Sequence, residues 1–460
     1  MGARSVTVIG GGISGLTAAF RALERDPGVE LVLLEAGDVA GGTARSDTVD
    51  GYTVDWGPNG FLTNVPQTLD LAAAVGLGDR LQAASAAVNR RYLLKEGALE
   101  ALPGSPLAFA RTGLLPLSAK ARVLGEPFAS PRDAEIDETV FEFAERRLGR
   151  RFAESFIAPM VMGITAGDAR EISFDALFPR MRAMEVEHGS LVRAMFARMR
   201  EARARKGASD GPAGPFGRLT SFGAGGMQAL CDAIAGRLGA RVRLGARAST
   251  LERRGDRWIV GVEGGEVVEA EGIILATPAQ VSAGLVEPHA PEAAALMRSI
   301  PYVGVRVLGL GYDLKGVSRS LDGFGFLAPP GNGARLLGCV WTSSIFPDQA
   351  PQGKALLRII AGGAFDPEIV DMDDDEALGA VRADLSRIMG LEASPEMVRQ
   401  IRWARAIPQY TRGHLDRVRQ IEGLLGELPQ IALTGNAFHG VSLNDCVKDG
   451  GRAAASLLDA

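Results

Sequence analysis

The chain has 460 residues, of which 46% are hydrophobic and 23% are charged, and its formal net charge at neutral pH is −5. This length exceeds what one compact core holds, so we expect two or three domains, and the slight acidity argues against a nucleic-acid partner. The apolar stretches are too short to span a membrane, and a first strand near residue 5 leaves no room for a leader peptide, so we expect a cytoplasmic protein.

Cysteine and histidine are scarce. Cys231, Cys339 and Cys446 are far apart in the sequence, which argues against a disulfide framework and suits a reduced compartment. The four histidines show no spacing with cysteine that is typical of zinc ligands, so we expect no metal site.

The first predicted element is a buried strand at residues 6–9, which are rich in β-branched side chains. The motif Gly10-x-Gly12-x-x-Gly15 follows directly and opens a helical pattern. Glycines at these positions allow a tight turn, a close approach of the backbone to phosphates, and close packing of helix on strand. The free N–H groups of the helix start would bind a pyrophosphate.

A second predicted strand, residues 31–34, ends in Glu35. A carboxylate about 20 residues after the last glycine of such a motif can bind the ribose hydroxyls of a dinucleotide. The alternative is an acid that is merely exposed at a strand end. Strand, glycines, helix, second strand and acid occur here in the order that the dinucleotide fold requires.

A double glycine, Gly41-Gly42, comes next and resembles the motif with which amine-oxidase-like flavoproteins contact the flavin side of the pyrophosphate. Those proteins often have arginine directly after the pair, whereas this chain has Thr43 there and Arg45 two positions later. An ordinary glycine-containing loop is the alternative.

Residues 81–206 have a mostly helical pattern with breaks at proline. Within them, residues 98–128 are rich in Leu, Phe, Pro and Ala, which suits either an amphipathic surface on a bilayer or a substrate-domain core. Residues 193–206 carry arginines and a lysine at helical spacing, either as a solvated face or as a contact for anionic lipid or substrate carboxylates. Residues 207–217 are a predicted Gly/Pro/Ser linker.

The segment 221–227 opens another helix, but no β-branched strand precedes it, so we do not predict a second dinucleotide site there. Strands near residues 242–244, 258–260 and 272–275 are expected to return to the nucleotide domain. Residues 300–365 predict an antiparallel sheet, and the acidic run 371–376 predicts the first turn of a helix.

These patterns predict an α/β fold with a Rossmann-like dinucleotide-binding domain, an antiparallel-sheet substrate domain and a helical domain with a candidate membrane-contacting surface. The resemblance to amine-oxidase-like flavoproteins implies that the first is an FAD-binding domain of the glutathione-reductase and amine-oxidase type. The expected boundaries are 1–80 with 218–285 and 400–460 for the FAD-binding domain, 81–206 for the helical domain and 286–399 for the β-rich domain.

Several motifs together resemble the oxygen-dependent protoporphyrinogen oxidase family, and they run nearly end to end. They lie at residues 163–173, 323–329, 337–347, 407–414 and 440–446. The resemblance implies an FAD enzyme of porphyrin biosynthesis that removes hydride from a porphyrinogen to the flavin. No acid–base group is expected to take part, because the cofactor carries such chemistry.

The resemblance also implies site residues. Arg91 matches a basic residue near a substrate propionate, Phe324 and Leu327 match apolar residues that sandwich the tetrapyrrole, and Gly163 matches a pocket-lining glycine. The alternatives are an exposed strand arginine and ordinary core residues. The expected FAD contacts are Gly10, Gly12, Ile13, Ser14, Gly15, Glu35, Gly41, Gly42, Thr43, Arg45, Gly57, Pro58, Ala248, Ala276, Gly435, Asn436, Val441 and Leu443.

The expected substrate is protoporphyrinogen IX, with molecular oxygen as acceptor. Coproporphyrinogen III, with more carboxylates and a need for more cationic anchors, stays an alternative substrate. An amine oxidase, a carotenoid desaturase and a flavin-free binding scaffold are further alternatives. Peripheral contact with the inner face of the cell membrane is expected, and a ferrochelatase hand-off and a homodimer are left open.

Overall fold

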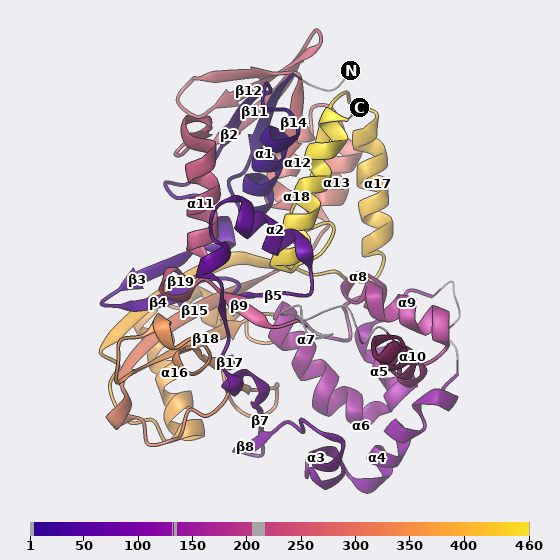
Figure 1. Ribbon diagram of the computed structural model, residues 1–460, viewed down its shortest axis with the longest axis vertical. Helices are drawn as coiled ribbons and strands as arrows, with labels where there is room; N and C mark the ends of the chain where they lie inside the picture. The colour runs from indigo at the N-terminus through magenta and orange to yellow at the C-terminus, as the bar shows by residue number, and fades with distance from the viewer. Residues whose placement is uncertain (1–3, 131, 133–135, 205–216, 460) are drawn as a thin grey trace. The chain divides into compact units, whose positions relative to one another are not determined.

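The computed structural model in Figure 1 describes residues 4–130, 132, 136–204 and 217–459. The chain forms two compact units. The first unit consists of Met1–Ala84, Ala213–Pro301 and Asp416–Ala460, and the second consists of Ser85–Pro212 and Tyr302–Leu415.

A five-stranded parallel sheet organises the first unit. Its strand order is β10 (Val242–Arg243), β2 (Glu30–Leu34), β1 (Ser5–Ile9), β14 (Gly272–Leu275) and β20 (Ile431–Leu433). The central strands β1 and β14 are buried along their whole length, as their β-branched residues predict. Because all five strands run the same way, the residues that follow them gather at one edge of the sheet, where ligands bind in such folds.

Helices and a three-stranded antiparallel meander complete this unit. The helices are α1 (Ile13–Arg25), α2 (Pro66–Ala74), α11 (Gln228–Leu238), α12 (Ala279–Val286), α13 (Pro291–Arg298), most of α17 (His414–Gly426) and α18 (Leu443–Leu458). The meander is β11 (Ala248–Arg254), β12 (Arg257–Val262) and β13 (Val267–Ala270), and the short strands are β3 (Ser46–Val49), β4 (Tyr52–Asp55), β5 (Phe61–Leu62), β6 (Gln82–Ala83) and β9 (Leu219–Ser221).

The helix α18 packs directly on α1, which brings the two ends of the chain together (Figure 1). A Cβ atom on Gly450 would lie 2.5 Å from the carbonyl oxygen of Ser14. The two helices can therefore cross this closely only because residue 450 has no side chain. The neighbouring Gly451 has room for a side chain, since a Cβ atom there would meet only the Arg21 side chain, at an ordinary contact distance of 3.9 Å.

A seven-stranded mixed sheet organises the second unit. Its order is β19 (Met397–Pro408), β15 (Tyr302–Asp313), β18 (Lys354–Gly362), β17 (Leu336–Trp341), β16 (Gly325–Leu327), β7 (Arg91–Lys95) and β8 (Ala98–Ala101). Only the β16–β7 pair is parallel. Helix α16 (Asp374–Met389) packs its buried residues against this sheet, and three acidic residues occupy its first turn as predicted.

The helical part of the second unit surrounds a separate core in which Phe143 stacks on Phe174. Its helices are α3 (Pro106–Arg111), α4 (Leu117–Leu124), α5 (Val140–Leu148), α6 (Arg150–Phe152), α7 (Ala158–Thr165), α8 (Phe174–Leu177), α9 (Pro179–His188) and α10 (Leu191–Ala204), and the sheet also carries α14 (Thr342–Ile345) and α15 (Glu368–Asp371).

The observed units differ from the expected domains in several places, and residues 81–84, expected in the helical domain, belong to the first unit. Residues 286–301, including α13, belong to the first unit, and residues 400–415, including the end of β19, belong to the second. The hairpin β7–β8, within the stretch expected to be mainly helical, pairs with β16 and joins the β-rich part to the helical part in one unit. Most of the expected linker, residues 207–216, lies outside the described residues.

The crossing of α1 and α18 generates a prediction with an internal control. Gly450→Ala should lower the free energy of unfolding by about 1–3 kcal/mol, because the new methyl group has no room. Gly451→Ala should raise it by roughly 0.5–1 kcal/mol, because alanine is the better helix former and its methyl group has room there. Guanidinium unfolding of both variants in excess FAD measures the difference. Equal effects of the two substitutions would contradict the close crossing.

Candidate cofactor and substrate sites

The glycine motif forms the turn between β1 and α1. Gly10 has φ of +109°, and a Cβ atom there would lie 2.6 Å from the carbonyl oxygen of Ala276. A Cβ atom on Gly15 would collide with the carbonyl oxygen of Gly10. Gly12 caps α1 without any side-chain hydrogen bond, and the first turn of the helix has no acidic residue. The backbone N–H groups of that turn, from Ile13 to Gly15, therefore face no competing carboxylate of their own helix.

The double glycine lies beside this turn. The N–H of Gly41 donates to the carbonyl oxygen of Gly11 at 2.8 Å, and Gly12 and Gly41 form a parallel bridge. Both Gly41 and Gly42 have positive φ, +129° and +57°, and a Cβ on Gly42 would approach Gly12 Cα at 3.1 Å. The structure thus brings two glycine motifs, some 30 residues apart, into one backbone cradle.

Glu35 follows β2 and is fixed by backbone donors. Its carboxylate accepts hydrogen bonds from the N–H of Gly11 at 2.6 Å and from the N–H of Gly37 at 2.7 Å. Each carboxylate oxygen has more than one lone pair, so Glu35 can still accept from a hydroxyl. Its position at the glycine turn fits the predicted role towards a ribose.

A buried clamp that the sequence analysis missed supports the double glycine. Asp55, at the end of β4, accepts a hydrogen bond from the Ser46 hydroxyl at 2.5 Å and from the N–H of Met227 at 2.9 Å. The Ser46 hydroxyl in turn accepts from the N–H of Gln228, whose side chain donates to the carbonyl oxygen of Ala40. The signal in the sequence was a carboxylate at the end of a strand of aromatic and β-branched residues.

This clamp explains the glycine-rich segment before α11. A Cβ on Gly226 would lie 2.7 Å from Asp55 Oδ1, so the segment is closed against the clamp. Gly57 lies against the carbonyl oxygen of Thr43, and the N–H of Trp56 donates to the carbonyl oxygen of Arg45. The Arg45 side chain pairs with Asp47 at 3.4 Å, and Pro58 follows Gly57 in the first unit.

The C-terminal motif begins where β20 ends. The Thr434 hydroxyl donates to Asp449 at 2.7 Å, and the N–H of Gly435 donates to the same oxygen. Ser442 and Asp445 form a capping box at the start of α18. Asn444 accepts from Thr68 and donates to the carbonyl oxygen of Leu62, so it fixes α18 to the segment around α2.

All predicted cofactor residues belong to the first unit. Ala276 follows β14, and its N–H donates to the carbonyl oxygen of Ile9. Ala248 begins β11. Asn436 and Val441 lie in the loop before α18, and Leu443 is buried at the start of that helix. The glycine cradle, the uncapped start of α1 and the ordered carboxylate of Glu35 fit a dinucleotide with a pyrophosphate. Their individual contacts with it remain predictions.

The four predicted substrate residues belong to the second unit and form two contacting pairs. The guanidinium of Arg91 lies 5.0 Å from the centre of the Phe324 ring. A Cβ on Gly163, in α7, would lie 2.9 Å from a methyl group of Leu327. Leu327 lies in β16, and Phe324 directly precedes that strand, so β16 connects the pairs. Partial desolvation lowers the pKa of Arg91 from its ordinary value, but arginine stays charged at neutral pH.

The neighbouring Arg90 is engaged elsewhere. Its guanidinium forms an ion pair with Asp322, whereas no acidic partner of Arg91 is found among the described residues. Of these two adjacent arginines, Arg91 is therefore the one whose charge no carboxylate among the described residues neutralises, and its role towards a substrate stays a prediction.

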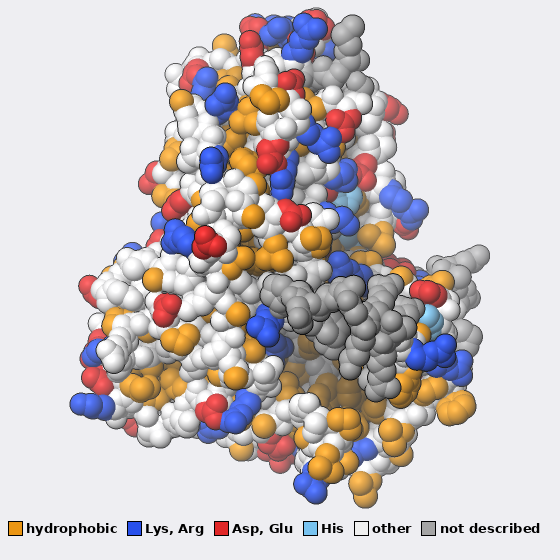
Figure 2. All heavy atoms as spheres, viewed as in Figure 1, with side chains coloured by type: hydrophobic (Ala, Val, Ile, Leu, Met, Phe, Trp, Pro, Cys, Tyr) orange, Lys and Arg blue, Asp and Glu red, His pale blue; other side chains and the backbone are white. Residues whose placement is uncertain are grey.

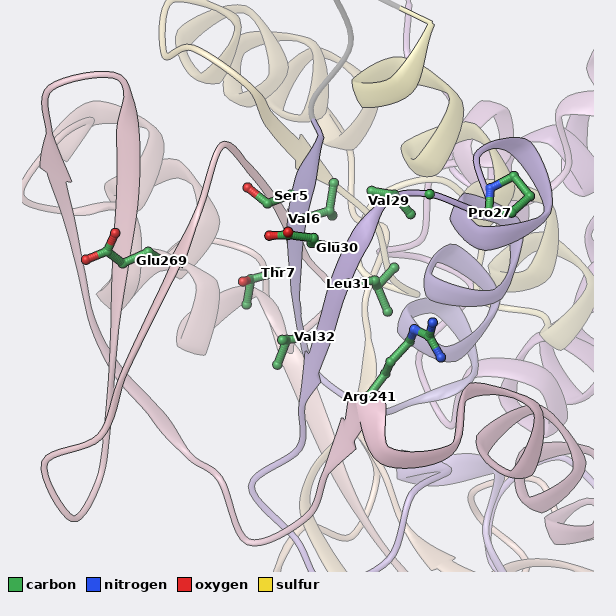
Figure 3. A pocket seen from close by; sticks show the side chains of 11 residues that line it. Ser5, Val6, Thr7, Pro27, Val29, Glu30, Leu31, Val32, Arg241 and Glu269 are labelled. Atoms are coloured by element: carbon green, nitrogen blue, oxygen red, sulfur yellow. The ribbon is translucent and has the colours of Figure 1, made fainter.

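A cavity of about 430 Å³ opens at a different place in the first unit (Figure 3). It lies at the amino ends of β1 and β2, where Ser5, Thr7 and Glu30 point away from the helical core, and Glu269 of the meander also lines it. None of the predicted cofactor residues lines it. It is therefore at the edge of the sheet opposite to the glycine turn.

The structure describes residues 4–130, 132, 136–204 and 217–459. No helix in that part of the chain is both long and apolar enough to cross a membrane. No cluster of His, Cys, Asp and Glu side chains within it could hold a metal ion. The three cysteines are buried, and burial raises the pKa of the Cys231 thiol to about 12, so this thiol is inert.

Comparison with known proteins decides the family. The family model described as flavin containing amine oxidoreductase matches residues 13–458. The chain belongs to this family. It is an FAD-dependent oxidoreductase, which is consistent with the cradle in the first unit.

Two relatives that are named as porphyrinogen oxidases match nearly the whole length of this chain. Coproporphyrinogen III oxidase of Bacillus subtilis (strain 168) is 31% identical, covering 99% of this chain and 98% of the relative. The chloroplastic protoporphyrinogen oxidase of Nicotiana tabacum is 30% identical, covering 98% and 84%. A solved structure from Exiguobacterium sp. 255-15 has a TM-score of 0.84 at 26% identity, covering 99% and 98%.

Glu35 provides a test of the cofactor site. Glu35→Gln should weaken FAD binding about tenfold to a hundredfold, because a charge-assisted acceptor is lost and the amide repels one of the two backbone donors. Glu30→Gln, at the exposed opposite end of the same strand, is the matched control and should leave the affinity unchanged. Flavin fluorescence quenching during titration of the apoprotein measures both. If Glu35→Gln bound FAD with the dissociation constant of the wild type, this carboxylate would not contribute to FAD binding.

Proposed function

We propose that the chain oxidises protoporphyrinogen IX to protoporphyrin IX with molecular oxygen as the acceptor. The observation that carries the proposal is the pairing of Arg91 with Phe324 beside the Gly163–Leu327 contact. An arginine next to apolar surface suits a wide, electron-rich macrocycle that carries carboxylates on one edge. The relatives named as porphyrinogen oxidases support the same substrate class.

The residues of the chain bind and orient, and the bound FAD supplies a two-electron acceptor for hydride. Conversion of a porphyrinogen to a porphyrin removes six electrons, so three rounds of oxidation are required, each reducing one oxygen molecule to hydrogen peroxide. Each round removes one hydride and one proton from the macrocycle. Of the three protons, two come from pyrrole N–H groups and one from a meso carbon, and all three leave to solvent. The role of Arg91 is to hold a propionate so that the same face of the macrocycle returns in each round.

The proposal of oxygen as the electron acceptor rests on the structure of the second glycine-rich segment. Residues 221–227 follow a three-residue antiparallel strand, β9, and close against Asp55. They therefore do not form the strand–turn–helix that a second dinucleotide needs. Within the described residues, the remaining glycine-containing loop that follows a strand of the parallel sheet and opens a helix is the one between β20 and α18. Its residues are among the proposed FAD contacts, which favours oxygen over a nicotinamide acceptor.

Coproporphyrinogen III is the second candidate substrate. It is favoured by the Bacillus subtilis relative, which this chain matches over nearly the whole length of both proteins. Against it, one of the two adjacent arginines at the proposed anchor is already neutralised by Asp322, whereas four propionates would need more free cations. Oxygen-dependent porphyrin fluorescence with both substrates side by side decides between them. A colourless, inactive protein would contradict both.

We also propose peripheral contact with the inner face of the cell membrane through α3, α4 and the turn that follows. Leu107, Leu117, Leu124 and Phe128 are 60%, 80%, 78% and 86% exposed. Figure 2 shows hydrophobic and basic side chains gathered over these helices. Leu114 and Leu115 in the same stretch are buried, so the core interpretation applies to these two residues, and the exposed residues support the proposed membrane contact.

Membrane contact is tested by flotation with vesicles that contain phosphatidylglycerol. The variant Leu117→Glu/Leu124→Glu should lose binding several-fold, because two exposed apolar anchors become anionic. Leu314→Glu, which changes another exposed leucine of the same unit, should bind like the wild type. Binding that is unaffected by the double substitution would contradict the proposed surface.

The anchoring role of Arg91 is tested by kinetics. Arg91→Ala should raise KM about tenfold with little change in kcat, because it removes binding that is equal in the ground and transition states. Arg90→Ala is the matched control and should change KM little, since Arg90 is paired with Asp322. An unchanged KM in Arg91→Ala would refute the anchoring role.

A further inference from the structure

The loop between β20 and α18, residues 435–440, is held at its start by the helix that follows it. Asp449 of α18 accepts hydrogen bonds from the Thr434 hydroxyl and from the N–H of Gly435, at 2.7 and 3.4 Å. Its other oxygen accepts from Arg452 Nε at 2.7 Å. A second guanidinium nitrogen of Arg452 donates to the carbonyl oxygen of Leu433 at 3.0 Å. The start of the loop is thus tied twice to α18.

The end of the loop is held by another helix. His439 Nε2 lies 2.8 Å from Glu422 Oε1 of α17. Arg452 approaches the same oxygen at 3.5 Å, so Glu422 connects the tie at the end of the loop to the tie at its start. Gly440, directly after His439, has φ of +131° and lies against Asp445. The chain therefore turns sharply at the point where the histidine holds it.

The charges of this network balance only with a protonated histidine. Glu422 from α17 and Asp449 from α18 contribute two negative charges, and Arg452 contributes one positive charge. The hydrogen bond with His439 lowers the pKa of Glu422 from its ordinary value, and Arg452 lowers it further. Glu422 is consequently a carboxylate over the pH range in which histidines change charge. Asp445, the remaining acid near this turn, is engaged by Ser442.

We propose that His439 and Glu422 are positioning residues for FAD, and that protonation of His439 tightens the loop and strengthens FAD binding as the pH falls. This inference rests on the proposed FAD contacts of Gly435, Asn436 and Val441, which lie in or directly after the tied loop. Since the side chains of His439 and Glu422 are 30% and 35% exposed, solvent screens their interaction. The expected effect is therefore modest, a change of about threefold in the dissociation constant of FAD.

The experiment is a titration of the whole apoprotein with FAD, followed by flavin fluorescence, at several values between about pH 5.5 and 8.5, the range in which histidine titrates. The wild type should bind FAD about threefold more tightly at the acidic end. His439→Gln, which keeps a donor without a titrating charge, should give a dissociation constant that does not vary with pH. His439→Lys, whose charge is permanent, should keep tight binding at the alkaline end.

Two further variants separate this network from general electrostatics. Glu422→Gln should flatten the pH dependence in the same way as His439→Gln. His289→Gln removes a histidine of the same unit that is bound to the carbonyl oxygen of Leu251, and it should keep the pH dependence of the wild type. Thermal unfolding of each apoprotein shows whether the variants are folded. If His439 and Glu422 had only a structural role, their substitution would weaken FAD binding equally at every pH and would leave its pH dependence unchanged.

The outcomes distinguish this inference from the proposed function. A pH-independent affinity in the wild type, or an unchanged pH dependence in His439→Gln, would overturn the inference while FAD binding and oxidase activity stand. A wild-type apoprotein that binds no FAD would overturn both. Loss of the pH dependence in His439→Gln and Glu422→Gln, with its retention in His289→Gln, is the result that we expect.

Discussion

The structure depends on one close approach, the crossing of α1 and α18 at Ser14 and Gly450. The first of these helices begins at the N-terminal glycine turn, and the second follows the C-terminal loop, more than 400 residues later in the sequence. A methyl group at residue 450 would separate them, and the backbone of the loop would then no longer be fixed with respect to the turn. The first unit can therefore be completed only when the last part of the chain has folded onto the first.

Local patterns predicted much of the first unit. The turn at Gly10 and the strand end at Glu35 each involve residues close together in the sequence, so spacing and propensity were sufficient. The family assignment and the α/β fold, with its FAD-binding unit, are confirmed by the comparisons. The Asp55 clamp was not predictable in this way, because its partner Met227 is 172 positions away and no local rule connects them.

The second unit shows a different limit. The strands of residues 302–362 were predicted from their apolar, β-branched runs, but β7 and β8 were placed in a helical stretch. These strands are short and half exposed, so their own sequence carries little signal, and pairing with β16 decides their structure. Arg91 begins β7 and contacts Phe324 beside β16, so the residue proposed as the substrate anchor depends on the pairing that the sequence did not reveal.

A buried ion pair stabilises the helical part of the same unit. Glu126 and Arg147 are fully buried and approach each other at 2.5 Å. Desolvation alone would raise the pKa of Glu126, but hydrogen bonds from Ser190 and from the N–H groups of Leu191 and Val192, together with Arg147, hold it below its ordinary value. Because a carboxylate with a lowered pKa stabilises the fold above its unfolded pKa, this contribution is lost as acid protonates it.

The two units use different chemistry for their proposed ligands, and this difference bears on how one family serves many substrates. The cofactor cradle is made almost entirely of backbone, with glycines that admit no side chain at Gly10, Gly15 and Gly42. Substitutions at these positions are strained whatever the substrate is, because their space is filled by other backbone. The proposed substrate contacts are instead side chains on a sheet edge, such as Arg91 and Leu327, which can change without disturbing the cradle. If the proposed contacts hold the substrate, specificity for one porphyrinogen over another belongs to the second unit, where a few charges would decide it.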